Sequence, residues 1–568
     1  MNKLTDQLLK MEKHHSIFET AVRMLPLPVC AAFGDAAAPQ AVCFSNTPRV
    51  LGTKDSASIA KSFPNSVQAS GNAVLTSAGR NAAIPQGKRV AVLFSGGPAS
   101  GGHNVVCGLK RVLGKSNTLL GVKPGPKGLI KKSLFEISDA DIEIIINTGG
   151  FDFLGTDRTK IKTEEQFNAV KETCVHHNLD AIVVIGGDDS NTNAAVLAEF
   201  LFKNVKVDGS GVQVIGVPKT IDGDLQIGDL LPISFGFDTA TKIYGEMVGN
   251  ILQDTRSSLK YWHFIKLMGR SASHVALEVS LQTKPAVTIV SEEVAEKKQS
   301  LASIVEQIAQ TVAKRARQGI YHGGVLIPEG LIEFIPEMNG LIAELNEVLA
   351  NHAATFAAQE DEDKRGFIRQ KLSAANAQLL DSLPAYVVRM LLADRDSHGN
   401  LQVSLIPTEQ LLVDMVKARL KAIDESIPFA AHCHFLGYEG RCGAPTLFDA
   451  AYTYNLGLTA GSLILDGRTG YMATVTDLAN GGTPQAIPLA GLLNVERRHG
   501  KDEFVIEKAL VKMDSPAMRY FVSRRDEWAA EDCFCAPGPR QLWGEVARQM
   551  PISVALNSES DSLIFKIG

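Results

Sequence analysis

The chain has 568 residues, with 57 Lys plus Arg against 62 Asp plus Glu, a formal net charge of -5 and 45% hydrophobic residues. This profile excludes disordered and fibrous proteins and is typical of soluble α/β chains, with about 100–200 residues per domain. The near-neutral charge argues against a nucleic-acid partner, which clustered basic residues would bind. Because no run approaches about 18 apolar residues and the N-terminal residues are polar, the sequence predicts a cytoplasmic protein with no membrane partner.

The first 86 residues are rich in Ala, Ser, Asn and Pro and show little periodicity, apart from a predicted helix over Leu4–Met24. We expect an appended N-terminal extension over 1–86. Eight cysteines are too sparse for a disulfide scaffold. The one close pair, Cys533 and Cys535, lacks the spacing and the second ligand pair of a zinc site.

Beyond this extension, short apolar runs alternate with polar helical stretches. The first series of predicted strands covers 88–94, 141–146, 180–185 and 212–217, with helices such as 163–176 and 192–202 between them. A second series covers 262–267, 286–290, 323–327 and 432–436. Continuous apolar strands that alternate with helices indicate parallel sheets covered on both faces, so the fold class is α/β, with two doubly wound, Rossmann-like domains.

A long helical region interrupts the second series. Its predicted helices cover 341–356, 362–380 and 408–423, and we expect a surface insertion over about 340–423. The predicted organisation is therefore an extension over 1–86, one α/β domain over 87–256 and a second over 257–490. Residues 491–568 form a C-terminal segment predicted to pack back on both domains.

Ligands bind beyond the carboxyl ends of parallel strands, so the residues that follow each strand come first. After the first strand, Gly96, Gly97, Gly101 and Gly102 surround a turn that leads into a helix. Glycines let backbone N–H groups approach an anion, and a helix N-terminus adds partial positive charge. This pattern favours a phosphate cradle, although a tight turn without a ligand has the same residues. No GxxxxGK[ST] motif is present, and Gly209-Ser-Gly211 precedes a strand, so a nicotinamide cofactor is unsupported.

Two further strand ends carry charged side chains. Asp188 and Asp189 follow the strand over 180–185, either as helix-capping residues or as ligands; Mg²⁺ needs only one or two carboxylates beside phosphate oxygens, and we favour Asp188. Lys219 and Asp222 follow the strand over 212–217. A lysine can neutralise a transferring phosphoryl group, and an aspartate can take a hydroxyl proton. A polar loop without a catalytic role is the alternative for this segment.

Together these segments resemble the phosphofructokinases, specifically the long, pyrophosphate-dependent type. The matching segments, in family order over about residues 86–490, are Ser95-Gly-Gly-Pro98, Gly186-Gly-Asp-Asp-Ser190, Pro218-Lys-Thr-Ile-Asp-Gly-Asp224, Met268-Gly-Arg270, Pro328-Glu-Gly330 and Gly437-Tyr-Glu-Gly-Arg441.

The resemblance implies a Mg²⁺-dependent, reversible transfer from pyrophosphate to the 1-hydroxyl of fructose 6-phosphate. It implies that Gly97 contacts pyrophosphate, that Asp188 binds Mg²⁺ and that Asp222 accepts the proton. Fructose 6-phosphate would contact a larger set: Thr220, Ile221, Asp222, Met268, Gly269, Arg270, Glu329, Tyr438, Glu439, Gly440 and Arg441. Lys260 and Tyr261 would reach this sugar across the interface of a homodimer.

The resemblance also implies which phosphoryl donor is used. Asp189 resembles the residue that blocks the nucleotide α-phosphate position, and Lys219 resembles the residue that stabilises transferring charge from pyrophosphate. ATP-dependent relatives typically have Gly at both positions. Like charges about 4 Å apart at an effective dielectric near 20 repel by about 4 kcal/mol, enough to disfavour ATP about a thousandfold.

Three other functions stay open at this stage. An ATP-dependent phosphofructokinase requires that Asp189 point away from the nucleotide. Lipid and NAD kinases share a Gly-Gly-Asp loop but would not explain Met268–Arg270 together with Tyr438–Arg441. A non-catalytic regulatory subunit would typically lose catalytic groups, whereas Asp188, Lys219 and Asp222 are all present.

Overall fold

The computed structural model describes residues 25–81, 83–393, 405–498, 501–537 and 550–558. These residues form two compact units. Unit 1 comprises 25–240, 439–509 and 550–558, and unit 2 comprises 241–438 and 510–537. The helix predicted over Leu4–Met24 lies outside the described residues. The chain thus passes between the units at 240/241, 438/439 and 509/510, rather than at the predicted boundaries of 256/257 and 490/491.

Unit 1 is built on one large sheet with the strand order β1-β2-β14-β13-β8-β7-β3-β4-β5, and β6 pairs with β3. The strands β13, β8, β7, β3 and β4 are parallel, and those at both flanks are antiparallel. Their bounds are β1 (Val42–Val50), β2 (Ala73–Arg80), β3 (Arg89–Ser95), β4 (Thr118–Val122), β5 (Leu134–Glu136), β6 (Thr156–Asp157), β7 (Ala181–Gly186), β8 (Gln213–Pro218), β13 (Tyr471–Thr476) and β14 (Thr483–Pro488).

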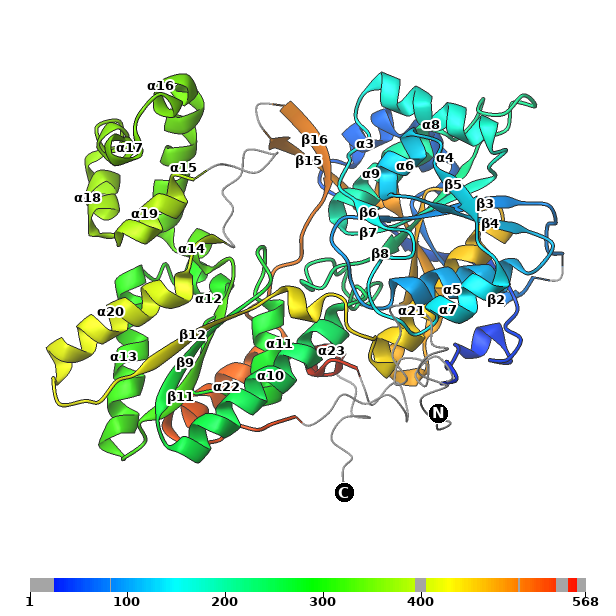
Figure 1. Ribbon diagram of the computed structural model, residues 1–568. Coiled ribbons are helices and arrows are strands. Elements are labelled where there is room, and N and C mark those ends of the chain that lie inside the picture. Colours follow the sequence, from blue (N-terminus) through cyan, green and yellow to red (C-terminus); the bar gives the residue numbers. More distant parts are fainter. Residues whose placement is uncertain (1–24, 82, 394–404, 499–500, 538–549, 559–568) are drawn as a thin grey trace, which may run out of the picture. The chain divides into compact units, whose positions relative to one another are not determined.

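Helices cover both faces of this sheet, with α5, α7 and α21 on one side and α8 and α9 on the other (Figure 1). Every residue of β7 is buried, as expected of a strand between two helical layers. The helices of unit 1 are α3 (Ser56–Ser62), α4 (Pro64–Ser70), α5 (Gly102–Leu113), α6 (Gly125–Ile130), α7 (Asp139–Ile145), α8 (Glu164–His176), α9 (Asp188–Phe200), α21 (Leu447–Leu465) and α23 (Ile552–Asn557). A two-stranded hairpin, β15 (Leu493–Arg498) and β16 (Lys501–Ile506), follows the sheet in sequence.

Two sequence predictions for unit 1 are wrong. The residues before 86 are not merely appended, because β1 and β2 extend the main sheet through the pairing of β2 with β14. The strand predicted over 141–146 is part of helix α7. Ser138 and Asp141 form a capping box at the start of this helix, each side chain accepting from the other residue's backbone N–H.

Unit 2 contains a parallel sheet with the strand order β10-β11-β9-β12. Its strands are β9 (Tyr261–Leu267), β10 (Val287–Thr288), β11 (His322–Pro328) and β12 (Ala431–Leu436). Figure 1 shows α13 (Leu301–Arg317) and α20 (Thr408–Ile423) on one side of this sheet, and α10 (Phe237–Ser258) and α11 (His274–Thr283) on the other. The predicted α/β fold with two doubly wound domains is thus confirmed.

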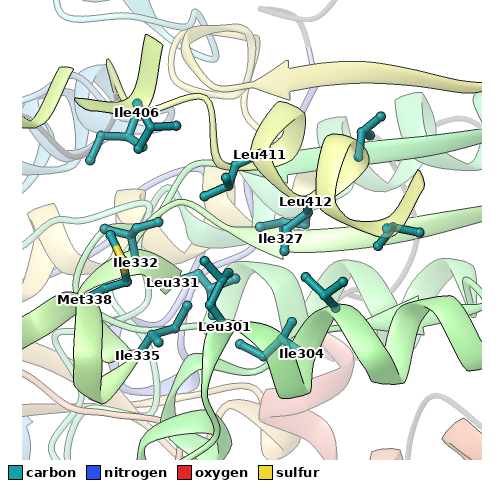
Figure 2. Packing of buried hydrophobic residues seen from close by; sticks show 14 of the residues in the cluster. Leu301, Ile304, Ile327, Leu331, Ile332, Ile335, Met338, Ile406, Leu411 and Leu412 are labelled. Carbon is teal, nitrogen blue, oxygen red and sulfur yellow. The ribbon is translucent and has the colours of Figure 1, made fainter. Parts of the chain in front are cut away.

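The helical region between β11 and β12 shares the core of unit 2. It contains α14 (Leu331–Phe334), α15 (Pro336–Asn351), α16 (Ala353–Ala357), α17 (Asp361–Arg369), α18 (Ala374–Ser382), α19 (Ala385–Leu391) and α20. Leu412 of α20 lies beside Ile327 of β11 (Figure 2), and both belong to one buried cluster with Leu411 of α20 and Leu301 of α13. Helix α20 covers one face of the sheet. The prediction of a surface insertion over 340–423 is therefore wrong for residues 408–423, which form this helix. The remaining helices of unit 2 are α12 (Ser291–Glu296) and α22 (Pro516–Ala530).

Among the described residues, we find no helix with both the length and the apolar character that a membrane crossing requires.

Candidate active site

The carboxyl ends of three neighbouring strands of unit 1 lie side by side. Phe94 of β3 pairs with Ile185 of β7, and Gly186 of β7 pairs with Pro218 of β8. The turns after these strands are therefore adjacent, and the Ser190 hydroxyl donates a hydrogen bond of 2.8 Å to the Ser95 hydroxyl oxygen. The three loops that the sequence singled out form one edge of the sheet.

The turn after β3 has the geometry expected of an anion cradle. Gly96 has φ 85°, a left-handed conformation that favours glycine, and α5 begins a few residues later at Gly102. A Cβ added at Gly97 would lie 2.5 Å from Arg441 Nη2, and one added at Gly96 would lie 3.5 Å from Lys219 Nζ. Two cationic side chains therefore adjoin this turn, and a Cβ at Gly97 would require the Arg441 side chain to move.

Asp188 and Asp189 occupy the first turn of α9, where the helix dipole favours negative charge. The capping position itself is Gly187, without a side-chain cap, so neither aspartate fills the capping role that the sequence left open. The Asn191 side chain donates to the carbonyl oxygens of Gly186 at 2.7 Å and Gly187 at 2.9 Å, which fixes the turn. Asp189 is exposed and Asp188 is half-buried.

The loop after β8 places Lys219 at the centre of the charged groups. Its backbone N–H donates to the Gly186 carbonyl at 2.9 Å, and its side chain is buried. Burial lowers the pKa of Lys219 to about 8, while the Asp222 carboxylate acts in the opposite direction. The Asp222 N–H donates to the Thr220 hydroxyl at 3.1 Å, which holds the loop in a local turn, and Ile221 is buried beneath it.

The carboxylates of this edge offer oxygen donors of the kind that divalent metal ions bind. Burial raises the pKa of Asp188; Lys508 opposes this shift, and the charges of Asp189 and Asp224 add to it. A carboxylate crowded by like charges is stabilised when a divalent cation binds, and hard oxygen donors are those that Mg²⁺ prefers. We call Asp188, Asp189, Lys219, Asp222 and Asp224 the aspartate–lysine cluster.

Sequence reasoning missed one member of this region. Lys508, which follows β16, has its ammonium 3.5 Å from Asp224 Oδ2. No motif or period marks this residue, and it lies beyond the predicted second domain. Lys508 reaches this region only because the hairpin packs against α9, and the sequence gives no sign of that packing.

Unit 2 contains a second set of predicted residues at the carboxyl ends of β9 and β11. The Met268 N–H donates to the Leu436 carbonyl, and the Gly269 N–H donates to Glu329 Oε2 at 3.0 Å. Gly269 has φ 129°, which only glycine adopts readily. Glu329 is buried and holds this turn, whereas Arg270 is exposed.

The predicted segment 438–441 is divided between the units. Tyr438, 72% exposed, ends unit 2, while Glu439, Gly440 and Arg441 begin the second stretch of unit 1. Within unit 1, Arg441 lies next to the turn at Gly97, and its charge acts on Lys219.

Lys260 and Tyr261 lie at the opposite end of β9 from Met268–Arg270. Met268 follows Tyr261 by seven positions, and at about 3.3 Å per residue the two are about 23 Å apart along the strand. Tyr261 stacks edge-on with His432, and the Lys260 ammonium lies 5.0 Å from the Tyr261 ring centroid. One sugar phosphate cannot touch both ends of this strand.

Comparison with known proteins identifies the class. The chain matches the family model described as Phosphofructokinase over residues 89–464. It belongs to the phosphofructokinase family.

Individual relatives are more specific. The chain is 49% identical over 474 residues to "Pyrophosphate--fructose 6-phosphate 1-phosphotransferase" of Treponema pallidum, covering 82% of each chain. It is 45% identical over 501 residues to "Pyrophosphate--fructose 6-phosphate 1-phosphotransferase subunit beta 1" of Arabidopsis thaliana, covering 86% of this chain and 85% of that one. The solved pyrophosphate-dependent phosphofructokinase of Nitrosospira multiformis aligns at 17% identity with a TM-score of 0.49, over 75% of this chain and 86% of that one. The family assignment rests on the sequence relationships.

Proposed function

We propose that this chain transfers a phosphoryl group from pyrophosphate to the 1-hydroxyl of fructose 6-phosphate, giving fructose 1,6-bisphosphate and orthophosphate. The observation that carries the proposal is the position of Lys219. Its buried ammonium lies against the Gly96–Gly97 turn and within the field of Asp222. Relatives with 45–49% identity that are named for this reaction support the same function.

In the proposed mechanism, Asp222 takes the proton of the sugar 1-hydroxyl. The oxygen attacks one phosphorus of pyrophosphate, the bond from that phosphorus to the bridging oxygen breaks, and orthophosphate leaves. Backbone N–H groups of the turn at Gly97 and the ammonium of Lys219 stabilise the charge of the transferring group. Asp188 would hold Mg²⁺, which neutralises phosphate charge when bound.

Two residues of unit 2, Arg270 and Glu329, are among those proposed to act at the sugar phosphate. Arg270 offers a planar fork of N–H donors that suits phosphate oxygens. Glu329 keeps the Gly269 turn in place. Because Tyr261 is about 23 Å from Met268 along β9, we propose that Lys260 and Tyr261 act on the sugar bound by a second copy, in a homodimer with shared active sites.

The direct test compares donors. Purified protein with Mg²⁺ and fructose 6-phosphate is given pyrophosphate or ATP as the only donor, and fructose 1,6-bisphosphate formation is measured. We expect activity with pyrophosphate at least a thousandfold above that with ATP in kcat/KM, and Asp189→Gly should raise the ATP value. Activity with ATP alone would replace this proposal with an ATP-dependent enzyme, and no activity with either donor would favour a regulatory subunit.

A further inference from the structure

Lys508 is held in place on both sides by the backbone around it. Before it, the Ile506 N–H donates to the Thr192 hydroxyl of α9 at 3.0 Å; after it, the Ala509 N–H donates to the Asp224 carbonyl at 2.7 Å. Ile506 is buried in the apolar cluster of unit 1. These contacts on both sides of Lys508 therefore hold it at the carboxyl edge of the sheet.

The charges around Lys508 are those of the aspartate–lysine cluster. Its ammonium is 3.5 Å from Asp224 Oδ2. Burial alone would lower the pKa of Lys508, but the carboxylates Asp188, Asp224, Asp222 and Asp189 reverse this and raise it. The ammonium is thus a charged member of the site that the family motifs do not include.

A lysine in this position could either balance a carboxylate charge or bind a ligand, and only ligand binding requires that its ammonium reach solvent. A structural lysine would only balance Asp224. A ligand-binding lysine must also reach solvent, and Lys508 is exposed, whereas Lys219 is buried. When a divalent ion binds at Asp188, it repels the nearby ammonium unless an anion lies between them. A metal-bound pyrophosphate is such an anion, and an ammonium offers three donors to it.

We propose that Lys508 binds the pyrophosphate donor directly, as a second lysine beside Lys219, and sets the affinity of the site for it. The assignment rests on the proposed function, because the ligand is the proposed donor. It gives the β15–β16 hairpin a role in donor recognition.

Binding is measured by isothermal titration calorimetry on the full chain without sugar, so that no turnover occurs. The titrants are Mg²⁺ alone and pyrophosphate in saturating Mg²⁺. We expect Lys508→Met to weaken pyrophosphate binding at least tenfold and to leave the KM for fructose 6-phosphate within twofold. Lys508→Arg should recover most of the affinity. Lys512→Met, at an exposed lysine four residues further on, is the matched control and should bind as the unaltered protein does.

The affinity for pyrophosphate, and not the affinity for Mg²⁺, separates the two roles. Removal of a cation beside the carboxylates should tighten Mg²⁺ binding in Lys508→Met, whichever role it has. Tighter Mg²⁺ binding with unchanged pyrophosphate affinity would overturn the assignment, because Lys508 would then only balance charge. Unaltered protein that binds no pyrophosphate would overturn the proposed function and this assignment with it.

Discussion

Asp222 is the residue on which the proposed chemistry depends most directly. It is half-buried, and its backbone N–H donates to the Thr220 hydroxyl, a contact that an asparagine at this position can also make. We expect Asp222→Asn to lower kcat by about a hundredfold to ten-thousandfold, the usual contribution of a general base. The KM values for both substrates should change little.

Steady-state kinetics with each substrate varied in turn would check this expectation. Thermal unfolding serves as the control and should match the parent protein within a few degrees. A variant that retains full turnover would remove Asp222 from the role of proton acceptor.

Lys219 gives the site a predicted pH dependence. Burial lowers its pKa to about 8 from an ordinary value of 10.5. The ammonium is therefore fully present well below pH 8 and is lost as the pH rises through this value. We expect kcat/KM for pyrophosphate to fall above about pH 8 as the stabilising charge disappears.

A pH profile of Lys219→Arg provides the comparison, since a guanidinium stays charged throughout this range. Whatever activity that variant has should lose the decline near pH 8. If parent and variant decline together, the titrating group is another one, such as the substrate itself.

The candidate residues differ in how far the sequence could predict them. Gly97, Asp188, Lys219 and Asp222 directly follow apolar strands, and parallel pairing brings such positions to one edge. Lys508 gives no such signal, because its place depends on tertiary contacts with residues such as Asp224, which is more than 280 positions earlier in the sequence. Long-range backbone contacts of this kind have no local pattern.

At the scale of elements, the difference between local sequence patterns and long-range contacts also explains the two wrong predictions for unit 1. The apolar run at Ile142–Ile146 resembles a strand. The capping box formed by Ser138 and Asp141 stabilises a helix start just before it, and the segment is helical up to Ile145. The strand β1 contains Ser, Asn, Thr, Pro and Arg, and more than half of its residues are exposed or half-buried, as befits an edge strand. Local composition alone does not show that such a segment joins a sheet.

Helices α5 and α21 pack through glycines. A Cβ at Gly457 would lie 2.2 Å from the Val105 carbonyl oxygen, and one at Gly108 would lie 2.2 Å from the Tyr454 carbonyl oxygen. Gly457→Ala must separate the helices, and we expect a loss of about 1–3 kcal/mol of stability, as for other overpacked sites. Because α5 begins beside the Gly96–Gly97 turn, the KM for pyrophosphate should rise as well.

The matched control is Gly340→Ala in helix α15, where a Cβ would meet nothing within 4 Å. It should stabilise the protein by about 0.5–1 kcal/mol, because alanine favours a helix more than glycine does. Thermal unfolding of the parent protein and of the two variants checks the expected loss of stability at Gly457 and the expected gain at Gly340. Equal effects of the two substitutions would contradict close packing at Gly457.

At the scale of the whole molecule, the proposed homodimer makes a quantitative prediction. Arg270 lies at the carboxyl end of β9 and Tyr261 at its start, so each sugar site would take these two residues from different copies. Tyr261→Ala and Arg270→Ala should each be nearly inactive alone. A hybrid dimer of the two variants would contain one site with both substitutions and one site with neither.

Random exchange of equal amounts of the two variants gives hybrids as half of all dimers, and half of their sites are intact. Mixed and refolded, or produced together, the two inactive variants should therefore recover about a quarter of the parent activity, since the restored site chemistry is unchanged. The measurement is the initial rate against each variant treated alone. Activity that equals only the mean of the two variants, in a sample shown to contain hybrids, would place Tyr261 and Arg270 outside a shared site.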